Sequence, residues 1–286
     1  MDKVVIFGVG LIGGSFALGL KAAGAAKHII GLGRNPANLE RALKLGVIDE
    51  ASDDPAAVAG ADLVMLATPV GQMGKVMRAI APHLGAGTVV TDGGSTKQDV
   101  AALAYRAFKG RVAQFVPGHP IAGAEHSGVT AARVDLFHNR KVVLTPLPEN
   151  SAASIRRVRA AWRLCGAKLY SMQPTEHDSV FAAVSHLPHL LSYALVDLVA
   201  RHPNGKQLFD YAAGGFRDFT RIASSHPEMW RDICVANRKA LLVELGGYQR
   251  ELAEMKALLR KGDAAGLEKM FTRARVARGK WLKKQQ

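Results

Sequence analysis

The 286-residue chain has little cysteine, and what it has is not arranged as a framework. Its two cysteines, Cys165 and Cys234, lie far apart and belong to no CxxC or Cys/His ligand pattern. This spacing argues against a structural zinc site and against a fold held by disulfides. A chain of this length buries a sufficient core without either, so we expect a protein of the reducing cytoplasm.

The chain also lacks the polar excess of disordered proteins, internal repeats and low-complexity linkers. Hydrophobic residues make up 48% and charged residues 22%, which is typical of a globular protein. The apolar run at 4–20 carries regularly spaced glycines and is followed by no small-residue cleavage pattern. It is therefore predicted to be neither a signal peptide nor a membrane span.

Basic residues outnumber acidic ones, giving a net charge of +14, but they do not form blocks. The exception is the segment 273–286, which we interpret as a solvated helix end. A scattered positive field attracts small anions as well as polymers. We expect a small anionic substrate as the partner, with no nucleic acid and no membrane.

The first half of the chain alternates short apolar runs with alanine-rich helical patterns, which predicts parallel strands joined by helices. The strand runs are KVVIFGV, KHIIGLG, ADLVMLAT and TVVTDGG, with AQFVPG, KVVLTP and AKLYSM predicted to extend the same sheet. From Pro174 onward the apolar spacing is helical, with breaks at Gly214-Gly215 and Pro227. The fold class is therefore α/β: a Rossmann-type, mostly parallel sheet domain over 1–173, followed by an all-α dimerisation domain over 174–286.

Gly8, Gly10 and Gly13 form the sequence GVGLIG directly between a strand run and a helix. In this context GxGxxG is a strong dinucleotide-binding signal. The first glycine permits the tight turn, the second lets the pyrophosphate approach, and the third allows close helix packing. Free amides at the helix start, including those of Leu11 and Ile12, would bind the phosphates.

The second strand ends without the acidic residue that an NAD site places on the ribose 2′-hydroxyl. Gly33 stands at this position and Arg34 follows it. A carboxylate would repel a 2′-phosphate, whereas a guanidinium attracts one. The pattern therefore favours NADP, with NAD as the alternative cofactor.

Three loops that follow strand runs are expected to meet at the edge of the sheet where ligands bind. They carry Thr68-Pro69, the segment from Asp92 to Ser95, and Gly118-His119-Pro120. Glycine and proline constrain the last loop, so His119 can be held in one orientation. A histidine near its ordinary pKa can exchange a proton during oxidation of an alcohol, although it can also serve only to hydrogen-bond its own loop.

The helical half contains two further groups of polar residues. His186 and His189 lie three apart and would share a helical face, but no third ligand accompanies them, so substrate contact or packing is favoured over metal. Arg217, Asp218 and Arg221 follow a glycine break. An arginine there can clamp a carboxylate or belong to a surface ion-pair network.

The motifs GVGLIGGSFALGLK, DGGSTK, GHPIAGAEHSG, SHLPHLLSYAL and GGFRDFTRIASSHPEMWRD occur in this order over most of the chain. Together they resemble the prephenate/arogenate dehydrogenases of tyrosine biosynthesis. The resemblance implies oxidative decarboxylation of a cyclohexadiene alcohol, with hydride passing to the nicotinamide and the ring becoming aromatic. It assigns to His119 the role of taking the hydroxyl proton, and to Ser95 that of helping to hold the hydroxyl.

The same resemblance places further residues in the substrate pocket and implies a homodimer through the helical half. Arg221 would bind a substrate carboxylate, His189 would line the pocket, and Glu125 would stand at its mouth. Gly214 and Trp230 would shape it. Apolar helix faces such as those at 188–200 and 239–259 would form the dimer.

The residues leave several alternatives open. Ala124 stands where relatives often have a hydroxyl residue, so arogenate or dual specificity is the alternative to prephenate, with Glu125 or Asp218 able to pair an ammonium group. A β-hydroxyacid dehydrogenase would instead use Lys97 as its acid or base. An NADP-binding regulator without turnover is the non-enzymatic alternative.

Overall fold

The computed structural model describes residues 1–124 and 126–283. The chain forms two compact units, Met1–Arg238 and Lys239–Gln286. The change from a mixed to a helical pattern falls inside the first unit, because the last strand, β9, ends at Ser171 and α6 begins at Pro174. The domain boundary predicted after residue 173 coincides with this change of secondary structure, whereas the two compact units are separated at Arg238. The boundary stays a prediction.

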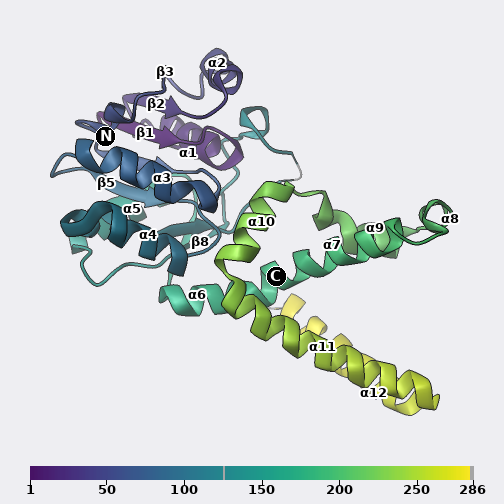
Figure 1. The fold of residues 1–286 in the computed structure, drawn as a ribbon. Helices are drawn as coiled ribbons and strands as arrows, with labels where there is room; N and C mark the ends of the chain where they lie inside the picture. Colours follow the sequence, from purple (N-terminus) through teal and green to yellow (C-terminus); the bar gives the residue numbers. More distant parts are fainter. Residues whose placement is uncertain (125, 284–286) are drawn as a thin grey trace. The chain divides into compact units, whose positions relative to one another are not determined.

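Six parallel strands form the main sheet in the order β3-β2-β1-β4-β5-β6 (Figure 1). They are β1 (Lys3–Phe7), β2 (His28–Leu32), β3 (Glu50–Ser52), β4 (Leu63–Leu66), β5 (Val89–Asp92) and β6 (Phe115–Val116). This is the doubly wound order in which the connections reverse between β1 and β4, and ligands bind beyond the carboxyl ends of the strands there. The predicted Rossmann-type sheet is confirmed.

Helices cover both faces of this sheet because its strands are apolar on both sides. Val4 and Ile6 belong to one core, and the alternate residues Val5 and Phe7 belong to the other. The first core includes side chains of α1, α2 and α5, and the second includes those of α3 and α4. These helices are α1 (Leu11–Ala22), α2 (Pro36–Lys44), α3 (Val70–Ile80), α4 (Gln98–Phe108) and α5 (Ala152–Leu164), with short turns η1 (Pro55–Val58), η2 (Ala81–His83), η3 (Lys109–Gln114) and η4 (Val129–Ala131).

The prediction that all later strands extend the main sheet is wrong in part. A second sheet contains β7 (Gly118–Pro120), antiparallel to β8 (Lys141–Leu144), which is parallel to β9 (Lys168–Ser171). Pro117 separates it from β6 because proline has no N–H for the ladder, and its carbonyl accepts the N–H of Thr145 at 3.0 Å. His119 pairs with Val143, so it lies on a strand and not on the predicted loop.

A wide π-helical turn interrupts the first long helical segment. The segment consists of α6 (Pro174–Phe181), the π turn η5 (Ala182–His186) and α7 (Leu187–Ala200). Pro188 explains the interruption, because it has no N–H to donate to the carbonyl of Val184 in a regular helix. By length and composition this segment could cross a membrane, and its buried His177 and Asp178 bond to neighbouring elements of the fold.

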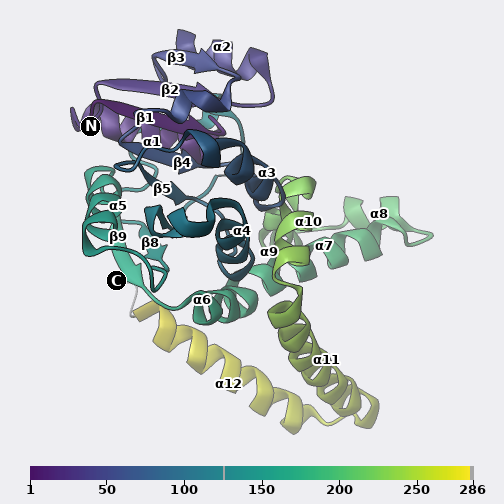
Figure 2. The same cartoon turned by 60° about the vertical axis from the view of Figure 1, so that its left-hand side comes forward.

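The remaining helices of the first unit are short. They are α8 (Gly205–Asp210), α9 (Gly214–Thr220), the 3₁₀ turn η6 (Arg221–Ser224) and α10 (Pro227–Ala236). The predicted breaks at Gly214 and Pro227 coincide with the starts of α9 and α10. Helix α10 lies against α3 (Figure 2), so closely that a Cβ on Gly71 would stand 2.5 Å from a carboxylate oxygen of Asp232.

The second unit consists almost entirely of α11 (Arg238–Lys261) and α12 (Ala264–Lys283). Gly262, with φ of 63°, makes the turn between them, and the two helices diverge from it (Figure 2). Both carry large apolar side chains that are exposed in the single chain: Leu242, Val243, Leu252, Leu259, Phe271, Val276 and Trp281. Such an apolar surface is typical of a protein interface.

We predict unequal stability effects for alanine at two glycines of the turn after β1. A Cβ on Gly13 would lie 2.2 Å from the carbonyl oxygen of Gly8, whereas the Cβ position of Gly10 has no atom within 4 Å. Gly13→Ala should lower the free energy of unfolding by about 1–3 kcal/mol through overpacking. Gly10→Ala should change it by less than about 0.5 kcal/mol. Urea unfolding of both variants tests this, and equal stability losses would contradict it.

Candidate active site

The glycine turn after β1 forms a cradle for a phosphate group. Gly8 has φ of 91°, a conformation that favours glycine. Gly10 is the N-cap of α1 and provides no side-chain cap, and nothing lies above its Cβ position. The N–H groups of the first helical turn, which includes Leu11, Ile12 and Gly13, lack intrahelical acceptors and lie at the positive end of the helix dipole. The cradle therefore fits the pyrophosphate of a dinucleotide.

The loop after β4 lies beside this cradle. A Cβ on Gly8 would stand 2.6 Å from the carbonyl oxygen of Ala67, which shows how closely the two loops approach. Thr68 and Pro69 follow, and Pro69 is the N-cap of α3. The Thr68 hydroxyl is buried and has no hydrogen-bond partner among the described residues. A ligand lying across the crevice would supply that partner.

The residues at the end of β2 lie at the other end of the predicted cofactor site. Gly33 has open space at its Cβ position apart from ordinary contact with Leu39 at 3.6 Å. The Arg34 side chain is 65% exposed, and its Nη2 lies 3.7 Å from Oε2 of Glu228 on α10. The guanidinium is therefore accessible to a phosphate, with one carboxylate near it.

His119 lies at the centre of a cluster of buried rings. Its Nδ1 lies 2.9 Å from Nε2 of His177 on α6, and its ring contacts Phe181 edge-on with centroids 4.9 Å apart. Pro120, the next residue, would contact a Cβ on Gly93 at 3.7 Å, and Ile12 of the first turn of α1 would contact the same atom at 3.1 Å. The histidine strand thus lies beside the dinucleotide cradle, as the predicted convergence of loops requires.

A buried ion pair holds the backbone next to His119. Lys97 Nζ contacts Asp92 Oδ2 and also donates to the carbonyl of Gly118 at 2.8 Å. Asp92 Oδ1 accepts the N–H of Gly118 at 3.0 Å. Both side chains are fully buried. The Lys97 ammonium is thus engaged by the protein itself, which argues against the alternative in which it acts as acid or base.

Burial keeps the histidines of this region neutral. It lowers the pKa of His119 well below 6.5, and the nearby His177, Lys97 and His186 add to the effect. Burial lowers the pKa of His177, although its hydrogen bond to Asp178 opposes the shift. It lowers the pKa of His186 to about 4. Neutral imidazole can accept a proton, so His119 is suited to act as a base at neutral pH.

Three of the predicted substrate residues form a second cluster. His189 on α7 stacks on Trp230 of α10, with ring centroids 3.6 Å apart and planes at 18°. Its Nδ1 donates to the carbonyl of Ser185 at 2.9 Å, which leaves Nε2 as an acceptor. Burial lowers the pKa of His189 and the positive charge of Arg221 lowers it further, whereas the hydrogen bond to Ser185 raises it. Arg221 therefore lies near this stack.

The other predicted pocket residues are placed less centrally. Gly214 begins α9, which contacts both α7 and η6. Ser95 lies half-buried on the loop after β5, and its backbone faces His186. The side-chain hydrogen bond found for the His119 ring goes to His177, not to Ser95. Glu125 lies outside the described residues.

The sequence analysis missed the polar groups that surround His119. His177 Nδ1 lies 2.8 Å from Asp178 Oδ1. Asn237 Nδ2 donates to the carbonyl of Asp178 at 2.8 Å and lies 3.0 Å from Nδ1 of His186. Their only signal was the presence of ionisable residues in an otherwise apolar helical segment. Nothing in the local pattern indicated that they would meet a strand about sixty residues earlier.

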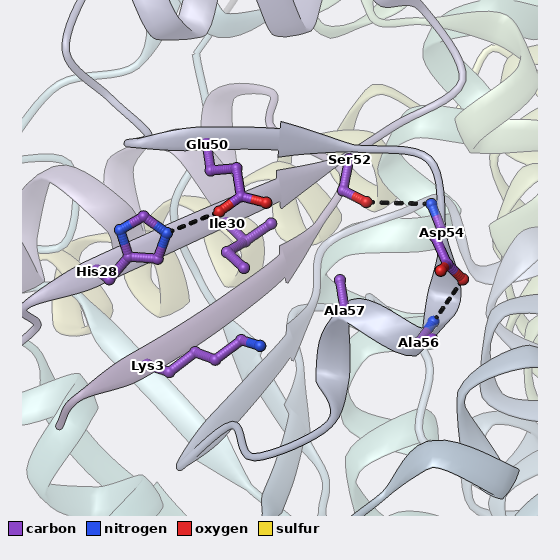
Figure 3. Close-up of a pocket in the computed structure, with 8 residues that line it drawn as sticks. All are labelled: Lys3, His28, Ile30, Glu50, Ser52, Asp54, Ala56 and Ala57. Carbon is purple, nitrogen blue, oxygen red and sulfur yellow. Dashed lines mark hydrogen bonds and ion pairs between the residues drawn. The ribbon is translucent and has the colours of Figure 1, made fainter.

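A separate hollow of about 440 Å³ lies away from these residues (Figure 3). Its lining includes Lys3 and His28, which begin β1 and β2, and Glu50, which begins β3. Ser52, Asp54, Ala56 and Ala57, at the end of β3 and in η1, also line it, so the hollow contains none of the residues around Gly8 and His119. The His28 and Glu50 side chains bond across it at 2.9 Å.

A doubly wound sheet, a glycine-rich phosphate cradle and a neutral buried histidine beside it define a nicotinamide-dependent oxidoreductase. Residues 16–171 match the nucleotide-binding domain of prephenate dehydrogenase, and residues 173–273 match its dimerization domain. The chain belongs to the prephenate dehydrogenase family.

Similar proteins agree with this assignment over nearly the whole chain. Prephenate dehydrogenase of Bacillus subtilis is 38% identical over 96% of this chain and 74% of its own length. Cyclohexadienyl dehydrogenase of Zymomonas mobilis is 34% identical over 96% of this chain and 94% of its own. The structure of Aquifex aeolicus prephenate dehydrogenase with hydroxyphenyl propionate and NAD⁺ superimposes with a TM-score of 0.90, at 36% identity and 98% coverage of both chains.

We predict that the buried histidines make the protein less stable as pH falls below 6.5. Between that value and the lowered native pKa, the unfolded chain binds protons that the native protein does not, so the free energy of unfolding decreases. For His186 this window extends from 6.5 to about 4. His186→Gln should reduce the slope of unfolding free energy against pH there by up to about 1.4 kcal/mol per unit.

Urea unfolding at several pH values in this window measures that slope. The slope can be compared even if the substitution changes absolute stability. An unchanged slope in the His186→Gln protein would contradict the prediction.

Proposed function

We propose that this enzyme oxidises and decarboxylates prephenate to 4-hydroxyphenylpyruvate, with NADP preferred over NAD. The observation that carries the proposal is the neutral, buried His119 beside the dinucleotide cradle. A ring alcohol losing hydride needs a base within hydrogen-bond reach of its hydroxyl. His119 is the titratable side chain that best meets this requirement, because Lys97 is engaged with Asp92 and Gly118.

In the proposed reaction His119 Nε2 accepts the proton of the substrate's C4 hydroxyl. When bound, the nicotinamide accepts the hydride that leaves the same carbon. The bond from C1 to the ring carboxylate then breaks, carbon dioxide leaves, and the electron pair of that bond completes the aromatic ring. The ring oxygen finally takes a proton back from His119, so the imidazole returns to its neutral form.

The second cluster is suited to hold the dianionic substrate. The positive charge of Arg221 acts on His189 and lowers its pKa, and a guanidinium binds a carboxylate through two parallel hydrogen bonds. His189 Nε2 offers an acceptor and Trp230 an apolar wall. We assign Arg221 to a substrate carboxylate, with His189, Gly214 and Trp230 lining the pocket. We also assign Ser95 to the substrate hydroxyl.

The preference for NADP rests on the end of β2. The relative from Aquifex aeolicus has NAD⁺ bound, but here Gly33 provides no carboxylate for a 2′-hydroxyl, and Arg34 is exposed beside it. A 2′-phosphate would gain a charge-assisted contact with Arg34. The Glu228 carboxylate, 3.7 Å from the guanidinium, would keep it oriented until a phosphate arrives.

We further propose that the enzyme is a cytoplasmic homodimer. The match to a dimerization domain over 173–273 supports this. So do the exposed apolar side chains of α11 and α12, which a second copy would cover.

His119→Asn should abolish most of the turnover. Asparagine can keep the donor that faces His177 but has no base in place of Nε2, so kcat should fall by about 10²–10⁴-fold. Reduced nicotinamide is followed with prephenate, arogenate and a 3-hydroxyacid offered in turn. The exposed His83→Asn serves as the control and should retain full activity. Full activity of His119→Asn, or turnover of arogenate alone, would contradict the assignment of base or substrate.

Gly33→Asp should shift the cofactor preference toward NAD. The new Cβ would make only ordinary contact with Leu39, and the carboxylate would repel a 2′-phosphate and would accept from a 2′-hydroxyl. The ratio of kcat/KM for NADP to that for NAD should fall at least about tenfold, or roughly 1.4 kcal/mol. Gly33→Asn, similar in shape but uncharged, should retain more of the NADP preference. A ratio that is equal in wild type and Gly33→Asp would disprove the phosphate argument.

A further inference from the structure

The carboxylate of Asp178 is the end of a buried hydrogen-bonded chain that leads to His119. Asp178 is 1% exposed. Its Oδ1 accepts the backbone N–H of Lys97 at 2.8 Å, and its Oδ2 accepts that of Gln98 at 2.9 Å, where α4 begins. Burial alone would raise the pKa of Asp178, but the hydrogen bonds from His177, Gln98 and Lys97 hold it below its usual value. Asp178 is therefore ionised and can only accept hydrogen bonds.

An acceptor at this end determines where each proton of the chain lies. Because Asp178 Oδ1 accepts, His177 carries its proton on Nδ1. His177 is neutral, so its Nε2 has a lone pair and accepts from the atom 2.9 Å away, which is Nδ1 of His119. His119 then carries its proton on Nδ1, and its Nε2 is left unprotonated. The order of donors and acceptors admits only this arrangement while both imidazoles are neutral.

We propose that Asp178 and His177 are positioning residues that hold His119 in the tautomer with a free Nε2. The inference rests on the proposed function, in which that nitrogen is the base. Neither residue needs to touch substrate or cofactor. Without the carboxylate, the opposite tautomer becomes available, and in it Nε2 carries a proton and cannot accept another.

Asp178→Asn tests this with little change of shape. The new amide oxygen can still accept the Gln98 N–H, and its NH₂ group, in the place of Oδ1, donates to His177 Nδ1, while the Lys97 N–H loses its acceptor. His177 then carries its proton on Nε2, His119 Nδ1 must accept, and Nε2 of His119 becomes protonated. We expect kcat to fall at least about a hundredfold, with the KM values for prephenate and NADP changing less than about threefold.

Asp99→Asn is the matched control. Asp99 lies in the first turn of α4, the helix whose first N–H groups Asp178 binds. It is largely buried, and burial raises its pKa. It bonds to neither histidine, so kcat should stay within about twofold of wild type. A comparable loss in both variants would mean that Asp178 acts by supporting the start of α4, and would overturn the proposal.

Nitrogen-15 NMR of the histidine rings provides a readout that is independent of activity. In the wild type, His119 and His177 should both show the Nδ1–H tautomer, with signals assigned from the His119→Asn and His177→Gln proteins. Both should change to Nε2–H in Asp178→Asn. Unchanged tautomers would overturn the proposal whatever happens to kcat. Active His119→Asn together with the expected tautomers would instead refute the proposed function alone.

Two variants of His177 keep the proposal testable if Asp178→Asn fails to fold. His177→Gln retains an oxygen that can accept from His119 Nδ1, so kcat should stay within about tenfold of wild type. His177→Leu removes the acceptor and should lose at least about a hundredfold. Equal kcat values for the two variants would overturn the proposal.

Discussion

The buried contact between Lys97 and Asp92 is the constraint on which the arrangement of the site depends. Together these two side chains bind both the N–H and the carbonyl of Gly118, the residue before His119. Asp92 also accepts the N–H of Gly94 at 2.8 Å. Two buried charges are tolerated only when such additional hydrogen bonds satisfy them. The pair thereby ties the loop after β5 to strand β7 and fixes the backbone next to His119.

The helical segment completes a site that the sheet alone would leave open. The main sheet supplies the cofactor cradle and the second sheet supplies His119, whereas α6 supplies His177 and the Asp178 carboxylate that accepts a hydrogen bond from it. α7 and α10 supply the stacked His189 and Trp230. His119, His177 and His186 are buried and their pKa values are lowered, although the chain as a whole carries a net charge of +14. The cation next to His119 is Lys97, and its charge is paired with Asp92.

Local pattern was sufficient to predict the dinucleotide fold and its cradle. The glycines at 8, 10 and 13 follow a buried strand. Their roles depend on the local backbone conformation, which the spacing of the glycines is enough to indicate. The change to helices at Pro174 was also visible in the apolar spacing. The second sheet was not predicted, because Pro117 ends the pairing of the chain with the main sheet. Which strand β7 then pairs with depends on tertiary contacts and not on the composition of the segments. His177 and Asp178 were missed for the same reason, since their partners are distant in sequence.

The π turn between α6 and α7 sets the rotational phase of everything that follows it in the helix. One residue corresponds to about 100° of rotation in an α-helix, so the extra residue of Ala182–His186 decides which way His189 faces. The carbonyl of Ser185, inside that turn, is the acceptor that orients the His189 ring. A homologous chain lacking a single residue here would keep its composition and its hydrophobic pattern and would still present a different side chain to Trp230. Deletion of one residue in this segment would therefore change the shape of the pocket within an otherwise unchanged fold.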